Sequence, residues 1–76
     1  MIGGNVIAYT QDELLEAKRQ IDSTLHKLRE TVRTLEAKEN RERYRSQITL
    51  AQRRIKAFEI AVHFIENALE AGSDIK

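Results

Sequence analysis

Residues 35–44 read LEAKENRERY, and they separate two hydrophobic patterns of helical spacing. Upstream, apolar side chains recur every three or four residues as far as Leu35, and the same spacing resumes at Tyr44. These two positions are nine residues apart. On a continuous helix, at about 100° per residue, the second apolar row would lie about half a turn away from the first. Only a reversal of the chain lets the two rows pack together, so this stretch predicts an antiparallel helical hairpin.

The first helix has a well-defined start in the sequence. Thr10 can cap it, and Glu13 stands three residues later, which completes a capping box. We expect this helix over about residues 10–38. Lys18 interrupts its apolar row once, and a lysine in such a row usually extends along apolar surface until its charge reaches solvent. The row consists of Leu14, Ile21, Leu25, Leu28, Val32 and Leu35.

The second helix carries an uninterrupted apolar row. We expect a turn at about 39–41, where Asn40 tolerates tight backbone geometry, and a helix over about 42–71. Gly72 is a natural left-handed stop for this helix. The row consists of Tyr44, Ile48, Ala51, Ile55, Phe58, Val62, Ile65 and Leu69.

A second apolar row lies beside the first on this helix. One helix from the same chain cannot cover both rows, and exposed apolar patches mark interfaces. We therefore expect a homodimer that forms a four-helix bundle. The alternative is that the N-terminal lead, residues 1–9, a flexible segment or short strand, folds across the row within one chain. The predicted self-association residues are Leu50, Ala57, Ile60, Ala61, Phe64 and Ala68.

Composition agrees with a small all-α protein. The chain has 76 residues, no proline and no cysteine, so it has neither disulfides nor thiolate metal ligands. A single core in so short a chain is marginal without further support, and association is the support that remains. We expect one domain, with a lead over 1–9 and a hairpin over 10–76.

Charge is distributed unevenly along the chain. Residues 27–56 contain ten basic and four acidic side chains, a net charge of +6. Residues 1–26 have a net charge of −2 and residues 57–76 a net charge of −3. The hairpin is therefore expected to have a basic turn end and an acidic open end.

Two interpretations of the basic end remain. Its cations can contact nucleic-acid phosphates, or pairs at helical spacing can keep the turn soluble. Because the aromatic Tyr44 belongs to the hydrophobic row, no stacking platform for bases is evident, and we favour the second interpretation. The expected pairs are Lys38–Glu42, Glu39–Arg43 and Glu42–Arg45. The candidate anion-contact residues are Arg41, Arg43, Arg45, Arg53 and Arg54.

No catalytic, cofactor or metal site is expected. Glu59, His63, Glu66 and Glu70 have the spacing of helical metal ligands, but we expect their face to point away from both apolar rows and into solvent. No apolar run approaches the ~20 residues of a membrane span. The first residues lack the pattern of a secretory signal, so a cytoplasmic location is expected.

Two segments, YTQDELLEAKRQIDSTL (9–25) and RRIKAFEIAVHFIENAL (53–69), resemble a group of short, uncharacterised bacterial helical-hairpin proteins. The resemblance implies the hairpin fold and transfers no activity. From the sequence we expect a non-enzymatic interaction or scaffold module that binds an unidentified protein partner. The alternative function is a small nucleic-acid-binding or regulatory accessory protein.

Overall fold

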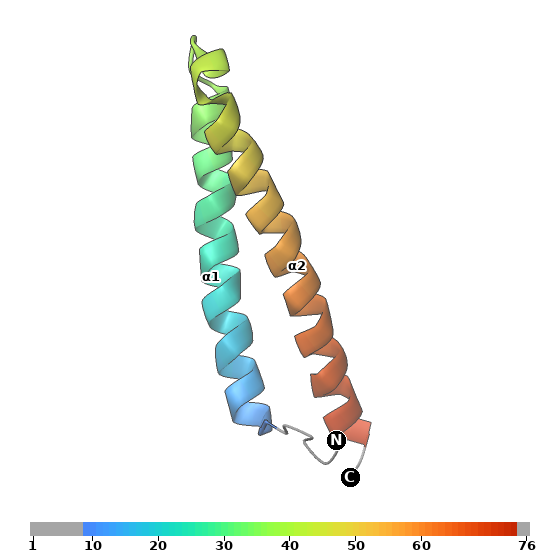
Figure 1. The fold of residues 1–76 in the computed structure, drawn as a ribbon. Helices are drawn as coiled ribbons and strands as arrows, with labels where there is room; N and C mark the ends of the chain where they lie inside the picture. The colour runs from blue at the N-terminus through green and yellow to red at the C-terminus, as the bar shows by residue number, and fades with distance from the viewer. Residues whose placement is uncertain (1–8, 75–76) are drawn as a thin grey trace.

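The chain folds as a helical hairpin. The computed structural model describes residues 9–74, with side chains described over 9–71. The two long helices lie side by side and run antiparallel, so both ends of the described chain lie at the end opposite the turn (Figure 1). The predicted all-helical fold and chain reversal are confirmed, whereas residues 1–8 of the predicted lead over 1–9 lie outside the described residues. The elements are α1 (Gln11–Glu36), a short 3-10 helix η1 (Arg41–Tyr44) and α2 (Arg45–Asp74).

The start of α1 is fixed by the expected capping box. The Glu13 N–H donates to Thr10 Oγ1 at 3.0 Å, and the Thr10 N–H donates to Glu13 Oε1 at 2.9 Å. Two backbone donors that the helix itself cannot satisfy are thereby paired. Asp12 and Glu13 also place negative charge at the positive end of the helix dipole.

The turn is longer than the sequence predicted. α1 ends at Glu36, the Ala37 N–H donates to the Arg33 carbonyl at 3.2 Å, and η1 follows Asn40 before α2 begins at Arg45. No described non-glycine residue has a positive φ, and Asn40 has a φ of −101°. Because the chain reverses without a left-handed residue, it uses an irregular segment and a 3-10 turn instead of a tight loop at 39–41.

The expected end of α2 also differs from the structure. The helix continues through Gly72 to Asp74, so Gly72 does not act as a left-handed stop.

The two predicted apolar rows face each other and form the seam of the hairpin. Every member of both rows is buried or half-buried, and Lys18 is half-buried among them. Only Leu25 and Ala51, at 4% and 6% exposed, are fully buried among the described residues. The molecule measures 54 × 27 × 15 Å, and its thinnest dimension is little more than one helix with its side chains. A single layer of two helices therefore has only a narrow core.

Removal of the N-terminal cap tests the fold at its best-defined boundary. Thr10→Ala leaves the Glu13 N–H without its partner, so we expect the free energy of unfolding to fall by about 1 kcal/mol. Urea unfolding followed by circular dichroism at one fixed protein concentration measures the change.

Thr24→Ala is the matched control. The Thr24 hydroxyl donates to the Gln20 carbonyl at 3.1 Å within α1, and this carbonyl already belongs to the helix ladder. Alanine has the higher helix propensity, so this change should leave stability the same or slightly higher. An equal loss in both variants would contradict the role of the cap.

Candidate interaction surfaces

An apolar stripe follows one side of α2, about a third of a turn from the seam. Its two large members are exposed: Phe64 by 70% and Leu50 by 49%. Ala61 is half-buried, and the other alanines are exposed. Nothing in the described chain covers the large side chains. We call this surface the α2 stripe, and it consists of Leu50, Ala57, Ala61, Phe64 and Ala68.

The structure places two residues in surroundings that differ from those predicted from the sequence. Ile60 is half-exposed and lines a pocket with Lys56 and His63. It stands three residues after Ala57 and four before Phe64, so it lies at the margin of the α2 stripe and not within it. Arg54 was assigned to the basic group, yet it occupies the helical position between Leu50 and Ala57. Counting steps of four and three residues from Leu50 would have found it.

The corresponding side of α1 is polar. Its row stands one residue before the seam positions of α1, as the α2 stripe does on α2, so in antiparallel helices both rows lie on the same side of the hairpin. Glu13 and Ala17 of this row line a pocket with the seam residue Ile65. Apart from Ala17 this row contains no apolar side chain, and its polar members are exposed. The two helices thus present unlike surfaces on the same side of the molecule. The row consists of Glu13, Ala17, Gln20, Thr24, Lys27 and Thr31.

The pocket lined by Glu13, Ala17 and Ile65 is a largely apolar hollow near the open end of the hairpin. It has a volume of about 350 Å³, and Tyr9 and Leu14 complete its lining. The alternative cover for the second row was the lead over 1–9, and residues 1–8 of this lead lie outside the described residues.

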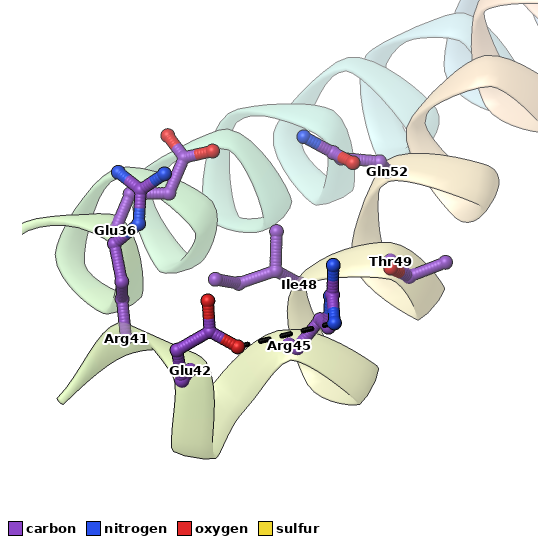
Figure 2. A pocket seen from close by; sticks show the side chains of 7 residues that line it. All are labelled: Glu36, Arg41, Glu42, Arg45, Ile48, Thr49 and Gln52. Carbon is purple, nitrogen blue, oxygen red and sulfur yellow. Dashed lines mark ion pairs between the residues drawn. The ribbon is translucent and has the colours of Figure 1, made fainter.

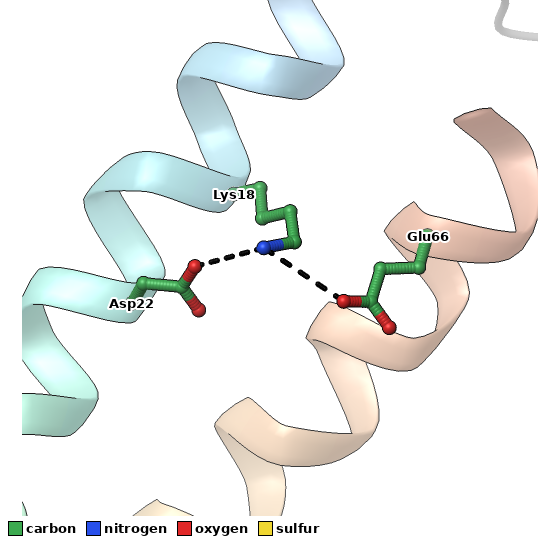
Figure 3. A network of polar contacts seen from close by, with 3 residues as sticks. All are labelled: Lys18, Asp22 and Glu66. Carbon is green, nitrogen blue, oxygen red and sulfur yellow. Dashed lines mark hydrogen bonds and ion pairs between the residues drawn. The ribbon is translucent and has the colours of Figure 1, made fainter.

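The opposite side of the hairpin is a polar groove. Lys18 leaves the seam and places its Nζ 3.0 Å from Asp22 Oδ2 on its own helix and 3.7 Å from Glu66 Oε2 on α2 (Figure 3). Arg29 bridges the helices further along, with its Nη2 2.7 Å from Glu59 Oε2. This groove encloses a pocket of about 550 Å³.

Glu59, His63 and Glu66 were expected to face solvent, away from both apolar rows; His63 and Glu66 are exposed and Glu59 is half-buried, but the two carboxylates also contact cations of α1. All three line the groove between α1 and α2, because positions flanking a seam can reach across it with long side chains. Over the described residues, no cluster of three or more acidic, histidine or cysteine side chains is arranged to hold a metal ion.

The basic turn end contains acidic neighbours. Arg41, Arg43 and Arg45 are exposed, and Arg45 Nη1 lies 3.9 Å from Glu42 Oε1. Figure 2 shows Arg41 extending toward Glu36 across a pocket of about 210 Å³ that Glu42 and Arg45 also line. Arg53 and Arg54 are exposed on α2, two helical turns beyond Arg45.

Of the three ion pairs expected at this end, Glu42–Arg45 is present. Lys38 instead lies over the Tyr44 ring, 5.8 Å from its centre. Residues 37–40 are not helical, so the helical spacing on which the other two pairs depended does not apply there.

In the part of the chain that the structure describes, neither helix has a stretch long and apolar enough to cross a membrane.

Comparisons with profiles of known protein families, with curated proteins and with solved structures find no match to this chain. The resemblance to bacterial helical-hairpin proteins therefore stays a prediction. The fold places the chain in the class of small antiparallel helical hairpins, and its function has to be inferred from its own surfaces.

The ion pairs of the polar groove predict that the stability of the fold depends on pH in the alkaline range. The hydrogen bond and charge of Asp22, with a smaller contribution from Glu66, raise the pKa of Lys18 above its ordinary value of 10.5. Folding thus favours the charged lysine, so this stabilisation is complete below pH 10.5 and is lost as the pH rises through the folded-state pKa. We expect the stability difference between the wild type and Lys18→Met to shift in favour of the variant above pH 10.5, as measured by urea unfolding.

Lys27→Met is the control, because Lys27 is exposed on α1 and forms no ion pair with any described residue. An identical alkaline response of the wild type, Lys18→Met and Lys27→Met would show that Lys18 has no special electrostatic role.

Proposed function

We propose that this protein is a non-enzymatic interaction module that self-associates through the α2 stripe and offers its remaining surfaces to a protein partner. In this proposal two hairpins form a homodimer of four helices. The observation that carries it is the exposure of Phe64 and Leu50 on one side of a helix that already buries another apolar row.

The energetics of a two-helix layer support association. Only Leu25 and Ala51 are fully buried among the described residues, and so narrow a core stabilises a short chain weakly. Complete burial of a phenylalanine or leucine side chain contributes about 1.5–3 kcal/mol relative to full exposure. A second hairpin supplies that burial for both chains, and it adds alanine contacts at which helices can approach closely.

The alternative, nucleic-acid binding by the basic end, has weaker support. Arg41 and Arg45 share their pocket with Glu36 and Glu42, whose carboxylates compete with phosphate for the same cations. Tyr44, the aromatic residue of this end, is half-buried in the seam and lies under Lys38. Bases would have no exposed ring there on which to stack.

Phe64→Glu tests the α2 stripe directly. Since Phe64 is mostly exposed in the single hairpin, the change removes little from the seam but places a charge where the second chain would pack. We expect the mass in sedimentation equilibrium to fall to half that of the wild type. If the isolated hairpin cannot fold alone, helicity at low protein concentration should fall as well.

Asn67→Glu introduces the same charge at an exposed α2 position away from the stripe, so it should remain dimeric and helical. A wild type that sediments as a monomer, or a Phe64→Glu variant with the wild-type mass, would refute self-association through this surface.

A further inference from the structure

The direction in which two hairpins pair follows from which surfaces they bring together. We propose that they pair in opposite directions, with the α2 stripe of one chain antiparallel to that of the other and the two turns at opposite ends. This inference rests on the proposed self-association and specifies its geometry. The proposed contacts join Leu50 to the partner's Ala68, Arg54 to the partner's Phe64, and Ala57 to the partner's Ala61.

The unlike sides of α1 and α2 decide between two symmetric arrangements. A two-fold axis parallel to the hairpins would stack each α2 stripe on the largely polar α1 row of the partner, so that Phe64 would meet Ala17 and Gln20 at its level. An axis perpendicular to the hairpins stacks α2 on α2 and leaves the α1 rows beside each other. Only the second arrangement buries apolar surface against apolar surface, and it stacks the polar α1 rows on each other, where polar side chains meet polar side chains.

The spacing along α2 fixes the register. The six positions from Leu50 to Ala68, with Arg54 included, are separated by four, three, four, three and four residues. This series reads the same in both directions, so a reversed copy can align all six positions at once about a midpoint between Ala57 and Ala61.

The side chains are complementary in that register. Leu50 meets the small Ala68 of the partner subunit, and alanines meet at the axis, where the two helices can approach closely. Arg54 lies against Phe64 of the partner subunit, where a guanidinium and an aromatic face attract each other. In this register Arg54, the charged residue within the stripe, therefore contacts an aromatic ring and not an aliphatic side chain.

The charge distribution also favours pairing in opposite directions. Residues 27–56 carry a net charge of +6, whereas 1–26 and 57–76 carry −2 and −3. Opposite pairing places each basic turn at the acidic open end of the other chain, and parallel pairing places the two basic turns together. This contribution is screened by salt, so the dimer should dissociate more readily as ionic strength rises.

Cysteine cross-linking tests the arrangement, because the chain has no cysteine of its own. Four single variants are needed: Leu50→Cys, Ala68→Cys, Thr31→Cys and the control Asn67→Cys. Pairs are mixed, unfolded and refolded in reductant, then oxidised mildly and separated by mass without reductant. A disulfide requires Cα atoms within about 7 Å. In the proposed dimer, residue 50 lies beside residue 68 of the other chain and about 27 Å along the axis from residue 50 of that chain.

We expect Leu50→Cys mixed with Ala68→Cys to form a linked heterodimer at least tenfold faster than either variant alone. Asn67→Cys, exposed and outside the stripe, gives the rate of random collision. Faster linking of Leu50→Cys with Thr31→Cys would indicate hairpins in the same direction, which overturns this inference but leaves self-association intact.

A wild type of dimeric mass that forms neither link would place the interface elsewhere and overturn both the geometry and the assigned stripe. A wild type of monomeric mass would refute the proposed function itself.

Discussion

The half-turn offset between two apolar rows is the constraint on which the structure depends. Leu35 ends one row and Tyr44 begins the next, and a continuous helix would turn these rows to opposite sides. Chain reversal removes the conflict, and every member of both rows is buried or half-buried in the folded hairpin. The reversal takes residues 37–44, an irregular segment followed by the 3-10 helix η1.

In a layer of two helices, each helix buries only the side that faces the other helix. The sides that remain uncovered differ in chemistry. In the polar groove, Lys18 lies between Asp22 and Glu66, and Arg29 meets Glu59, so charges on this side find partners within the chain. On the other side, Phe64 and Leu50 have no cover among the described residues. One side of the hairpin is therefore stabilised by contacts within the chain, and the other is the side on which we propose self-association.

The sequence predicted those features that depend on local pattern. The capping box of Thr10 and Glu13 is present as expected, and both apolar rows form the seam because helical spacing alone determines which side chains share a face. The length of the turn was not predictable from Asn40, because a residue that tolerates tight backbone geometry does not determine how many residues the reversal takes, and η1 extends it.

The contacts that Glu59 and Glu66 make with α1 were missed for another reason. Their face was judged against the apolar rows of α2 alone, whereas a side chain flanking a seam also encounters the cations of the opposing helix. Arg54 was grouped by its charge instead of its helical position, which hid its place within the α2 stripe. Contacts between two helices depend on how the helices pack together, and the apolar periodicity of one helix does not predict this packing.

The chain reversal is tested most directly by a distance within one molecule. Spin labels at Ser23→Cys and Asn67→Cys, both exposed positions, can be measured by pulsed electron paramagnetic resonance in chains diluted with excess unlabelled protein. Helices packed about 8–10 Å apart predict a label separation below about 30 Å. A separation near 66 Å, the length of the intervening segment as a continuous helix at about 1.5 Å per residue, would contradict the hairpin.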